Sequence, residues 1–415
     1  MTHHYRHFFH PAGHGTFFSG RIQSDNGSFP DFVWIYDCGS RRRSHLRALA
    51  EQFRRGLSPP RIDLMCLSHF DSDHVSGLDV FFQAGFHVDT LVLPYAPPAA
   101  RLLLAGALME EDATDSHQVA ALLLDPIHYL RRHDQLGRIG RIVLVRGAMP
   151  DDPDSREGVP FPVDPPRPAR NADSRVHIPN LESLSDEAAY GVTAIDGLTC
   201  MAHPQQAWTF DARYEFVFYN IPLRGDLAPR SGTGLKVIAQ QIRQLVDTYD
   251  LTRPGAAKPG WLAAIRALYT YHFGHTAHQR NAISLCVQAR SIQGHAYASC
   301  DHFKEAPGVC ELPVLDGDQI GVLLTGDISL NRKTLLALRQ HLGYRRWQSL
   351  ALMQIPHHGS RDSWQAGNSA ECQHPHNVIC APGTPLHPHS DVTMDLGSHV
   401  LADYAQAVAF NYHDR

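Results

Sequence analysis

The sequence predicts a layered α/β fold, and three observations support this prediction. Short apolar runs that suit strands alternate with amphipathic runs that suit helices. Two of the apolar runs, at 62–69 ("IDLMCLSH") and 88–95 ("VDTLVLPY"), are continuous, as in strands buried on both faces. Three apolar runs also end in histidine or aspartate, and layered α/β folds build their sites at strand ends.

The first part of the chain is expected to form strands, then helices and strands in alternation. Aromatic and β-branched runs predict the first strands, and Ser44 is the expected N-terminal cap of a helix that ends at Gly56. The expected elements are strands at 15–22 and 32–40, a helix at 45–55, a strand at 62–69, a helix at 75–85 and a strand at 88–95.

The middle of the chain contains a long segment without periodicity. Residues 149–185 are rich in Pro, Asp, Arg and Ser, so we expect a mobile loop that covers little core and is the first point of proteolytic cleavage. The regular elements around it are a helix at 117–133 with a kink at Pro126, a strand at 140–148, a strand at 214–223, a helix at 234–250 and strands at 282–289, 320–329, 351–360 and 376–383.

Composition limits the class of protein. A chain of 415 residues with 43% hydrophobic content can bury a large core, and its formal net charge of −5 lacks the basic character of a dedicated nucleic-acid coat. The sequence contains no apolar run long enough to cross a bilayer, and the polar N-terminus lacks a signal-peptide core. We therefore expect a cytoplasmic protein without a membrane partner, and the sequence leaves its oligomeric state open.

The stretch "SHFDSDH", residues 68–74, places four metal-ligand side chains directly after a predicted strand. His69 and Asp71 are two residues apart and Asp73 and His74 are adjacent, so one loop can direct them at two different ions. Imidazole and carboxylate suit Zn, Mn or Fe, and the lack of cysteine argues against a closed structural zinc site. The alternative is a polar loop that only caps a helix, but one capping residue would suffice for that.

This loop resembles the H-x-H-x-D-H signature of the metallo-β-lactamase fold. Three further motifs follow the family's order: "VWIYDCGS" resembles the early strand that ends in Asp-x-Gly, "VLLTGDIS" resembles the strand that delivers a bridging aspartate, and "PHHGSRDSW" precedes "GTPLHPHSD". The last combination, with "NAISL" at 281–285, resembles the branch containing DNA-uptake competence nucleases and phosphorylcholine esterases.

The resemblance implies a four-layer αββα metallo-β-lactamase sandwich with a large insertion. It implies one domain over 1–415, with core motifs in 8–100 and 275–415. Residues 101–274 are then an insertion that diverges from the family, and they include the loop at 149–185.

The resemblance also implies a role for each site residue. His69 and Asp71 would face metal one, Asp73 and His74 would face metal two, Asp327 would bridge both, and His358 would complete metal two. His357 and Ser360 would face the substrate, as would Asn281 unless it is a ligand. His387 takes a late position, as a ligand or as the acid for the leaving group. The expected catalytic residues are Asp73, His357 and His387.

Two departures from the family pattern affect metal one. Asp71 stands where the family usually has histidine, and its harder, anionic oxygen favours Mn²⁺ or Mg²⁺ over Zn²⁺. The third ligand of metal one is also open; the candidates are His278, Asn281, His203, His272 and His275. We expect two divalent ions, Mn or Zn, with Mg as a further possibility.

Two adjacent metals held by His and Asp serve hydrolysis, because they activate water and stabilise charge on the attacking and leaving oxygens. We expect a nuclease with DNA or RNA as substrate, with local basic surface from arginines at 41–55 and in the insertion; a solvated helix face is the plainer interpretation of the first group. The alternatives are a small-molecule phosphodiesterase or esterase of the same fold, and a metal-binding scaffold subunit with reduced activity. A regulatory protein partner or an activating protease remains open.

Overall fold

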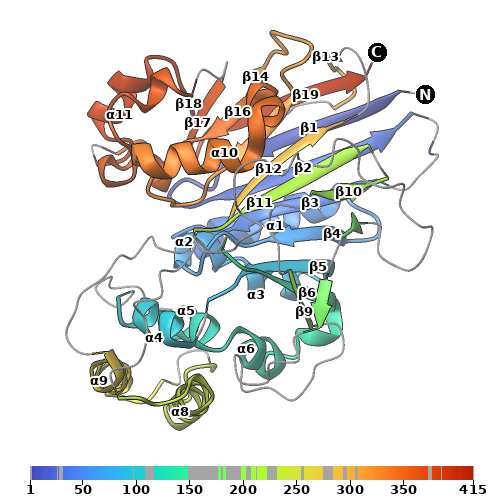
Figure 1. Cartoon of the computed structure of the whole chain (residues 1–415). Coiled ribbons are helices and arrows are strands. Elements are labelled where there is room, and N and C mark those ends of the chain that lie inside the picture. Colours follow the sequence, from blue (N-terminus) through green and yellow to red (C-terminus); the bar gives the residue numbers. More distant parts are fainter. Residues whose placement is uncertain are drawn as a thin grey trace.

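The computed structural model shows two stacked β-sheets between two layers of helices (Figure 1). It describes residues 2–25, 27, 31–96, 98–107, 116–147, 176–178, 181–183, 198–201, 207–211, 213–221, 231–253, 257–273, 284–292, 297–303, 307–372, 376–384 and 386–414. The predicted four-layer αββα sandwich is therefore confirmed. Within these ranges, none of the helices combines the length and apolar character that crossing a membrane requires.

The described strands form one sheet of 11 strands and one of eight. In spatial order, the larger sheet contains β13 (Tyr297–Ser299), β19 (Ala407–Asp414), β1 (His3–Phe9), β2 (Phe17–Ser24), β3 (Phe32–Cys38), β4 (Arg61–Cys66), β5 (His87–Pro94), β6 (Ile139–Val145), β9 (Leu198–Met201) and β8 (Leu181–Ser183), and β14 (Val309–Leu312) pairs with β19. The smaller sheet contains β18 (Val400–Ala402), β17 (His376–Cys380), β16 (Leu350–Gln354), β15 (Gly321–Leu324), β12 (Cys286–Ser291), β11 (Tyr214–Tyr219), β10 (Trp208–Phe210) and β7 (Val176–His177).

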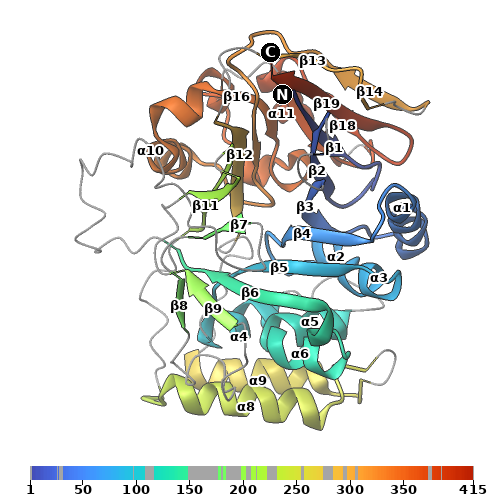
Figure 2. The same cartoon turned by 90° about the vertical axis from the view of Figure 1, so that its right-hand side faces the viewer.

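Helices cover the outer face of each sheet (Figure 2). Those on the side of the larger sheet are α1 (Arg43–Arg55), α3 (Leu78–Gln83), α4 (Pro98–Ala107), α5 (Ser116–Leu124) and α6 (Pro126–Arg132). Helices α8 (Leu235–Thr248) and α9 (Trp261–Phe273) pack in turn against α4. Those on the smaller sheet are α10 (Arg332–Gln348) and α11 (Ser390–Leu396). Short α2 (Ser72–Val75), η5 (His357–Gly359) and η6 (Arg361–Ser363) lie at strand ends, and η2 (Leu136–Arg138) and η7 (Asn368–Ala370) are further single turns.

Alternate residues of the larger sheet's strands build two separate cores. Ile35 and Met65 pack against the helices, whereas their neighbours Trp34 and Leu64 pack between the two sheets. This follows from the strand period of two, which turns successive side chains to opposite faces. Because both faces are covered, central strands such as β4 and β5 carry several apolar residues in succession, which explains the continuous runs in the sequence.

The structure differs from the sequence prediction at two helices. Ser44 is not a cap: α1 already begins at Arg43, and the preceding Arg42 makes no side-chain capping bond. The helix expected at 75–85 is divided into α2 and α3 at Gly77. A Cβ at Gly77 would lie 1.8 Å from the Cys38 carbonyl oxygen, so the chain passes too close to β3 for a side chain there. The kink predicted at Pro126 is confirmed, since α5 ends at Leu124 and α6 begins at Pro126.

The segment 101–274 contributes to both sheets. Its strand β6 pairs with β5 in the larger sheet, and β11 pairs with β12 in the smaller one. Most of the loop predicted at 149–185 lies outside the described residues. Its end differs from the prediction, because Val176 and Ile178 are buried in the core between the sheets. Their apolar character outweighs the polar composition of the residues before them.

Candidate metal centre

The predicted ligands come from strand ends in both sheets. In the larger sheet β3 and β4 run parallel, and in the smaller sheet β15, β16 and β17 run parallel, so each set presents its carboxyl ends together. The side chains that follow these strands are His69, Asp71, Asp73 and His74 after β4, Asp327 after β15, His357 and His358 after β16, and His387 after β17.

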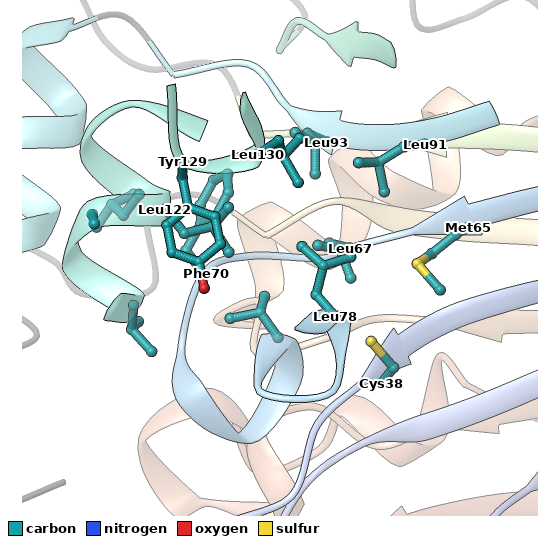
Figure 3. Packing of buried hydrophobic residues seen from close by; sticks show 14 of the residues in the cluster. Cys38, Met65, Leu67, Phe70, Leu78, Leu91, Leu93, Leu122, Tyr129 and Leu130 are labelled. Atoms are coloured by element: carbon teal, nitrogen blue, oxygen red, sulfur yellow. The ribbon is translucent and has the colours of Figure 1, made fainter. Parts of the chain in front are cut away.

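The loop after β4 is anchored by an apolar side chain. Phe70, between His69 and Asp71, is buried in the same core as Leu122 and Tyr129 (Figure 3). Helix α2 then begins at Ser72, with Asp71 at its N-terminal cap position but without a side-chain capping bond. The buried ring fixes the loop, and the carboxylate of Asp71 remains available for other contacts.

Ligand atoms of His69, His74 and Asp327 gather within 4.8 Å of one another. The Nε2 atom of His74 lies 3.1 Å from one carboxylate oxygen of Asp327, and the Nε2 atom of His69 lies 3.6 Å from the other. Asp71 is more peripheral: its carboxylate is 3.7 Å from His69 Nε2, and its side chain is 32% exposed. We call His69, His74 and Asp327 the Asp327 trio.

A second group contains His14, Asp73 and His358, whose ligand atoms also lie within 4.8 Å of one another. The Nε2 atom of His358 is 3.2 Å from Asp73 Oδ2, and the Nε2 atom of His14 is 3.5 Å from the same oxygen. We call this group the His14 trio. The family resemblance implied that His74 shares an ion with Asp73, whereas in the structure His74 lies beside His69 and Asp327.

Asp37 explains the orientation of His74. Its buried carboxylate accepts hydrogen bonds from the Ser68 backbone N–H, the Ser68 hydroxyl and His74 Nδ1, at 2.7, 2.7 and 2.8 Å. Holding Nδ1–H in this way leaves the lone pair of His74 on Nε2, directed at Asp327. The Nδ1 atom of His358 is held similarly, 2.6 Å from the Cys380 carbonyl oxygen.

The charges of the two trios are coupled. Burial opposes ionisation of Asp73, but the hydrogen bond from His358 and the charges of His74 and His358 hold the pKa of Asp73 well below its ordinary value. Burial likewise disfavours charge on His74, but Asp327 and Asp37 raise its pKa. Protons on buried histidines therefore compensate the buried carboxylates, a role that a metal cation can also fill.

The arrangement suits divalent metal ions. Within the described part of the chain, the buried Nε2 atoms of His69 and His74 meet no hydrogen-bond partner, although both point towards carboxylate oxygens. Buried polar atoms are seldom left without a partner, and imidazole and carboxylate are the donors that Zn, Mn and Fe accept. The two trios can hold one ion each, with Asp327 and Asp73 as their anionic ligands.

The predicted substrate-facing residues lie at the rim. His357 Nε2 is 3.7 Å from Asp327 Oδ2, its Nδ1 is 2.9 Å from the Ser363 hydroxyl, and its side chain is 32% exposed. The Ser360 hydroxyl is buried and accepts a hydrogen bond from the Asp362 backbone N–H. The ring of His387 lies 6.2 Å from that of His357 and 6.3 Å from that of His358.

An arginine also reaches this rim. The Nε atom of Arg41 is 3.7 Å from Asp73 Oδ2, and its side chain is 47% exposed. Of the arginines at 41–55, Arg42 instead lies over the ring of Tyr404, and Arg43 lies 3.9 Å from Asp79. The sequence therefore pointed to a patch, but the structure brings one of these three arginines to Asp73.

Most candidates for the third ligand of metal one lie outside the described residues: His203, His275, His278 and Asn281. The remaining candidate, His272, is described. Its Nδ1 is 2.8 Å from the Ser231 hydroxyl and its Nε2 is 2.8 Å from the Gln241 side-chain oxygen, so both ring nitrogens are engaged between α8 and α9. The structure therefore does not support His272 as a ligand.

Sequence reasoning missed His14. It lies between β1 and β2, and β1 was not predicted because its run of histidines hides the strand pattern. Since β1 and β3 both run antiparallel to β2, the loop after β1 lies at the same edge as the ends of β3 and β4. Recognising residues 3–9 as a strand would have brought His14 into consideration.

Comparisons with known proteins match part of the chain to a family model. Residues 30–172 match the family model described as the metallo-beta-lactamase superfamily; this range holds the signature loop and extends into the predicted insertion, while Asp327 and His358 lie beyond it. A solved structure, the crystal structure of a long form RNase Z from yeast, is similar with a TM-score of 0.29 and 10% identity, over 85% of this chain and 32% of that one, so the chain spans about a third of its length. No curated protein matches the chain. Residues 30–172 of the chain are thus similar to the metallo-beta-lactamase superfamily.

Proposed function

We propose that the protein is a metal-dependent phosphodiesterase that cleaves nucleic acid, DNA or RNA, with two divalent ions. The observation that carries this proposal is the convergence of the Asp327 trio and the His14 trio at the carboxyl ends of strands from both sheets. Two ions held side by side would supply an activated water and stabilise charge on the attacking and leaving oxygens.

The chain's own residues divide the remaining work. Asp73 stays ionised because of His358 and His74, so we assign it to hold and orient the attacking water rather than to store a proton. His357 presents Nε2 at the rim while Ser363 holds its Nδ1, which suits a contact to the substrate. His387 is our candidate for the acid that protonates the leaving group.

A phosphodiester suits this rim better than a neutral ester. Arg41 lies beside Asp73 and is half exposed, so its guanidinium can meet a phosphate oxygen that approaches the ions. A chain with a net charge of −5 needs such local cations to attract nucleic acid. The resemblance of the late motifs to the branch with competence nucleases points in the same direction.

The test is a metal-dependent cleavage assay on plasmid, single-stranded DNA, RNA and bis-p-nitrophenyl phosphate in parallel. We expect cleavage of at least one polymer, lost on metal removal and reduced about 100-fold or more in Asp327→Asn. Asp125→Asn is the matched control, because this buried carboxylate caps α6 in the helical layer. Cleavage of bis-p-nitrophenyl phosphate alone would indicate a small-molecule phosphodiesterase. No turnover on any substrate, with a tightly bound protein partner, would indicate a scaffold subunit.

A further inference from the structure

The position of His14 is fixed by the backbone around it. The Thr16 N–H donates a hydrogen bond to the Asp73 carbonyl oxygen at 3.0 Å, and the Arg41 N–H donates one to the His14 carbonyl oxygen at 2.9 Å. Gly15, at φ +151°, packs so closely that a Cβ there would lie 2.5 Å from the Gly39 carbonyl oxygen and 2.8 Å from that of Asp73. The loop after β1 is therefore held directly against the loop that carries Asp73.

The side chain of His14 faces the metal-ligand side chains. Its Nε2 is 3.5 Å from Asp73 Oδ2, its ring centroid is 5.0 Å from that of His358, and its side chain is only 18% exposed. Two imidazoles and one carboxylate form a donor set that suits Zn, Mn or Fe.

On the other side of the centre the Asp327 trio is buried, and the donor beside it that is more exposed is Asp71. Asp71 occupies the position where the family pattern has histidine, and it is more exposed than His14, at 32%. We expect this half-exposed carboxylate to exchange with water more readily than the His14 imidazole, which is less exposed and is held by its loop. Compared with the H-x-H-x-D-H signature, the chain lacks one imidazole beside His69, where Asp71 stands. It has an additional imidazole, that of His14, beside Asp73.

We propose that His14 is a direct metal ligand, and that the His14 trio binds its ion more tightly than the Asp327 trio with Asp71 binds the other. This inference rests on the proposed dinuclear centre and concerns the order in which its two positions bind metal. The protein would fill the two positions in sequence, the His14 trio first.

The test measures metal binding rather than turnover. Metal-stripped protein is titrated with Mn²⁺ in a calorimeter, and the bound ions are counted by elemental analysis. We expect two events that differ about tenfold or more in affinity. His14→Gln should weaken the tighter event about tenfold or more, and Asp71→Asn should weaken only the other.

His10→Gln is the matched control. His10 lies at the start of the same loop, where its ring stacks on Phe17 and bonds the Ser19 hydroxyl, so its loss loosens the loop without removing a ligand. Equal weakening by the His10 and His14 substitutions would overturn the assignment of His14 as a ligand. Two bound ions with the tighter event unchanged in His14→Gln would also overturn it while leaving the proposed function intact. Binding of no ion by the unaltered protein would overturn both.

Discussion

Asp37→Asn tests whether a residue that touches no predicted substrate controls the metal centre. Asp37 is buried and accepts three hydrogen bonds, two from Ser68 and one from His74 Nδ1. Asparagine has nearly the same size, and it tolerates the positive φ of 53° at this position better than most residues. The substitution therefore changes the charge and the hydrogen-bond pattern with little effect on packing.

The size of the effect follows from those three contacts. The amide can still accept from the Ser68 N–H, but its NH₂ group then faces the Ser68 hydroxyl and His74 Nδ1, where Asp37 had an acceptor. The Ser68 hydroxyl can turn and accept from the amide, so the bond lost is the one to His74 Nδ1. A hydrogen bond to a charged group contributes about 1.5–3 kcal/mol, and we expect a loss in that range. A proton on His74 would also move to Nε2, and metal affinity should fall roughly 10–100-fold.

Two measurements separate these effects. Urea unfolding of the metal-free protein reports the loss of stability as a lower midpoint at constant slope. Calorimetric titration with Mn²⁺ reports the affinity. Asp63→Asn is the matched control, because Asp63 is also buried and accepts the Val33 N–H at 2.8 Å, but lies near the start of β4. It should lose stability and keep its metal affinity. Unchanged Mn²⁺ affinity in Asp37→Asn would refute the role given to the carboxylate.

Three further predictions concern the same centre. Metal-stripped protein should regain activity best with Mn²⁺, and with Mg²⁺ more than with Zn²⁺, while Asp71→His should shift the preference towards Zn²⁺; strict zinc dependence of the unaltered protein would contradict this. Asp73→Ala should abolish turnover yet keep the circular-dichroism spectrum, because Asp73 lies at a strand end outside the apolar cores; an unchanged cleavage rate would exclude the dinuclear mechanism. Burial opposes charge on His74, but Asp327 and Asp37 raise its pKa. The protonated ring therefore stabilises the fold fully below pH about 6.5, and this stabilisation is lost as pH rises through the raised pKa. Denaturant unfolding of the metal-free protein should show a free energy of unfolding that falls above pH about 6.5, and a flat profile would contradict this coupling.

The sequence predicted the parts of the fold that depend on local pattern. Continuous apolar runs identified β4 and β5 because both faces of these strands are covered. Pro126 marked a helix boundary because proline lacks the backbone N–H that a continuous helix needs. The gathering of His69, Asp327 and His358 was also predictable, since each follows an apolar strand that ends at the same edge.

Features set by contacts between distant segments were not predictable. The helix is interrupted at Gly77 because the Cys38 carbonyl oxygen lies too close for a side chain. Val176 is buried because it packs into the core between the two sheets. His14 is one of 28 histidines, and only the parallel course of β1 and β3 distinguishes it from the others. Composition and spacing carry no information about such tertiary neighbours.

The ligands are divided between two parts of the chain, and this has a consequence for assembly. His14, Asp73 and His74 precede residue 149, whereas Asp327 and His358 follow residue 175. A protein cut between those positions would yield two fragments, neither of which carries a complete trio. In the larger sheet, β1 to β6 of the first fragment form one block, and strands of the second fragment flank this block at both ends. Metal ions would then control the reassociation of the two fragments, because they bind only the reassembled pair. An ion at one hundred times its dissociation constant stabilises the reassembled pair by about 2.7 kcal/mol. Metal supply would thus govern the yield of the reassembled protein as well as its chemistry.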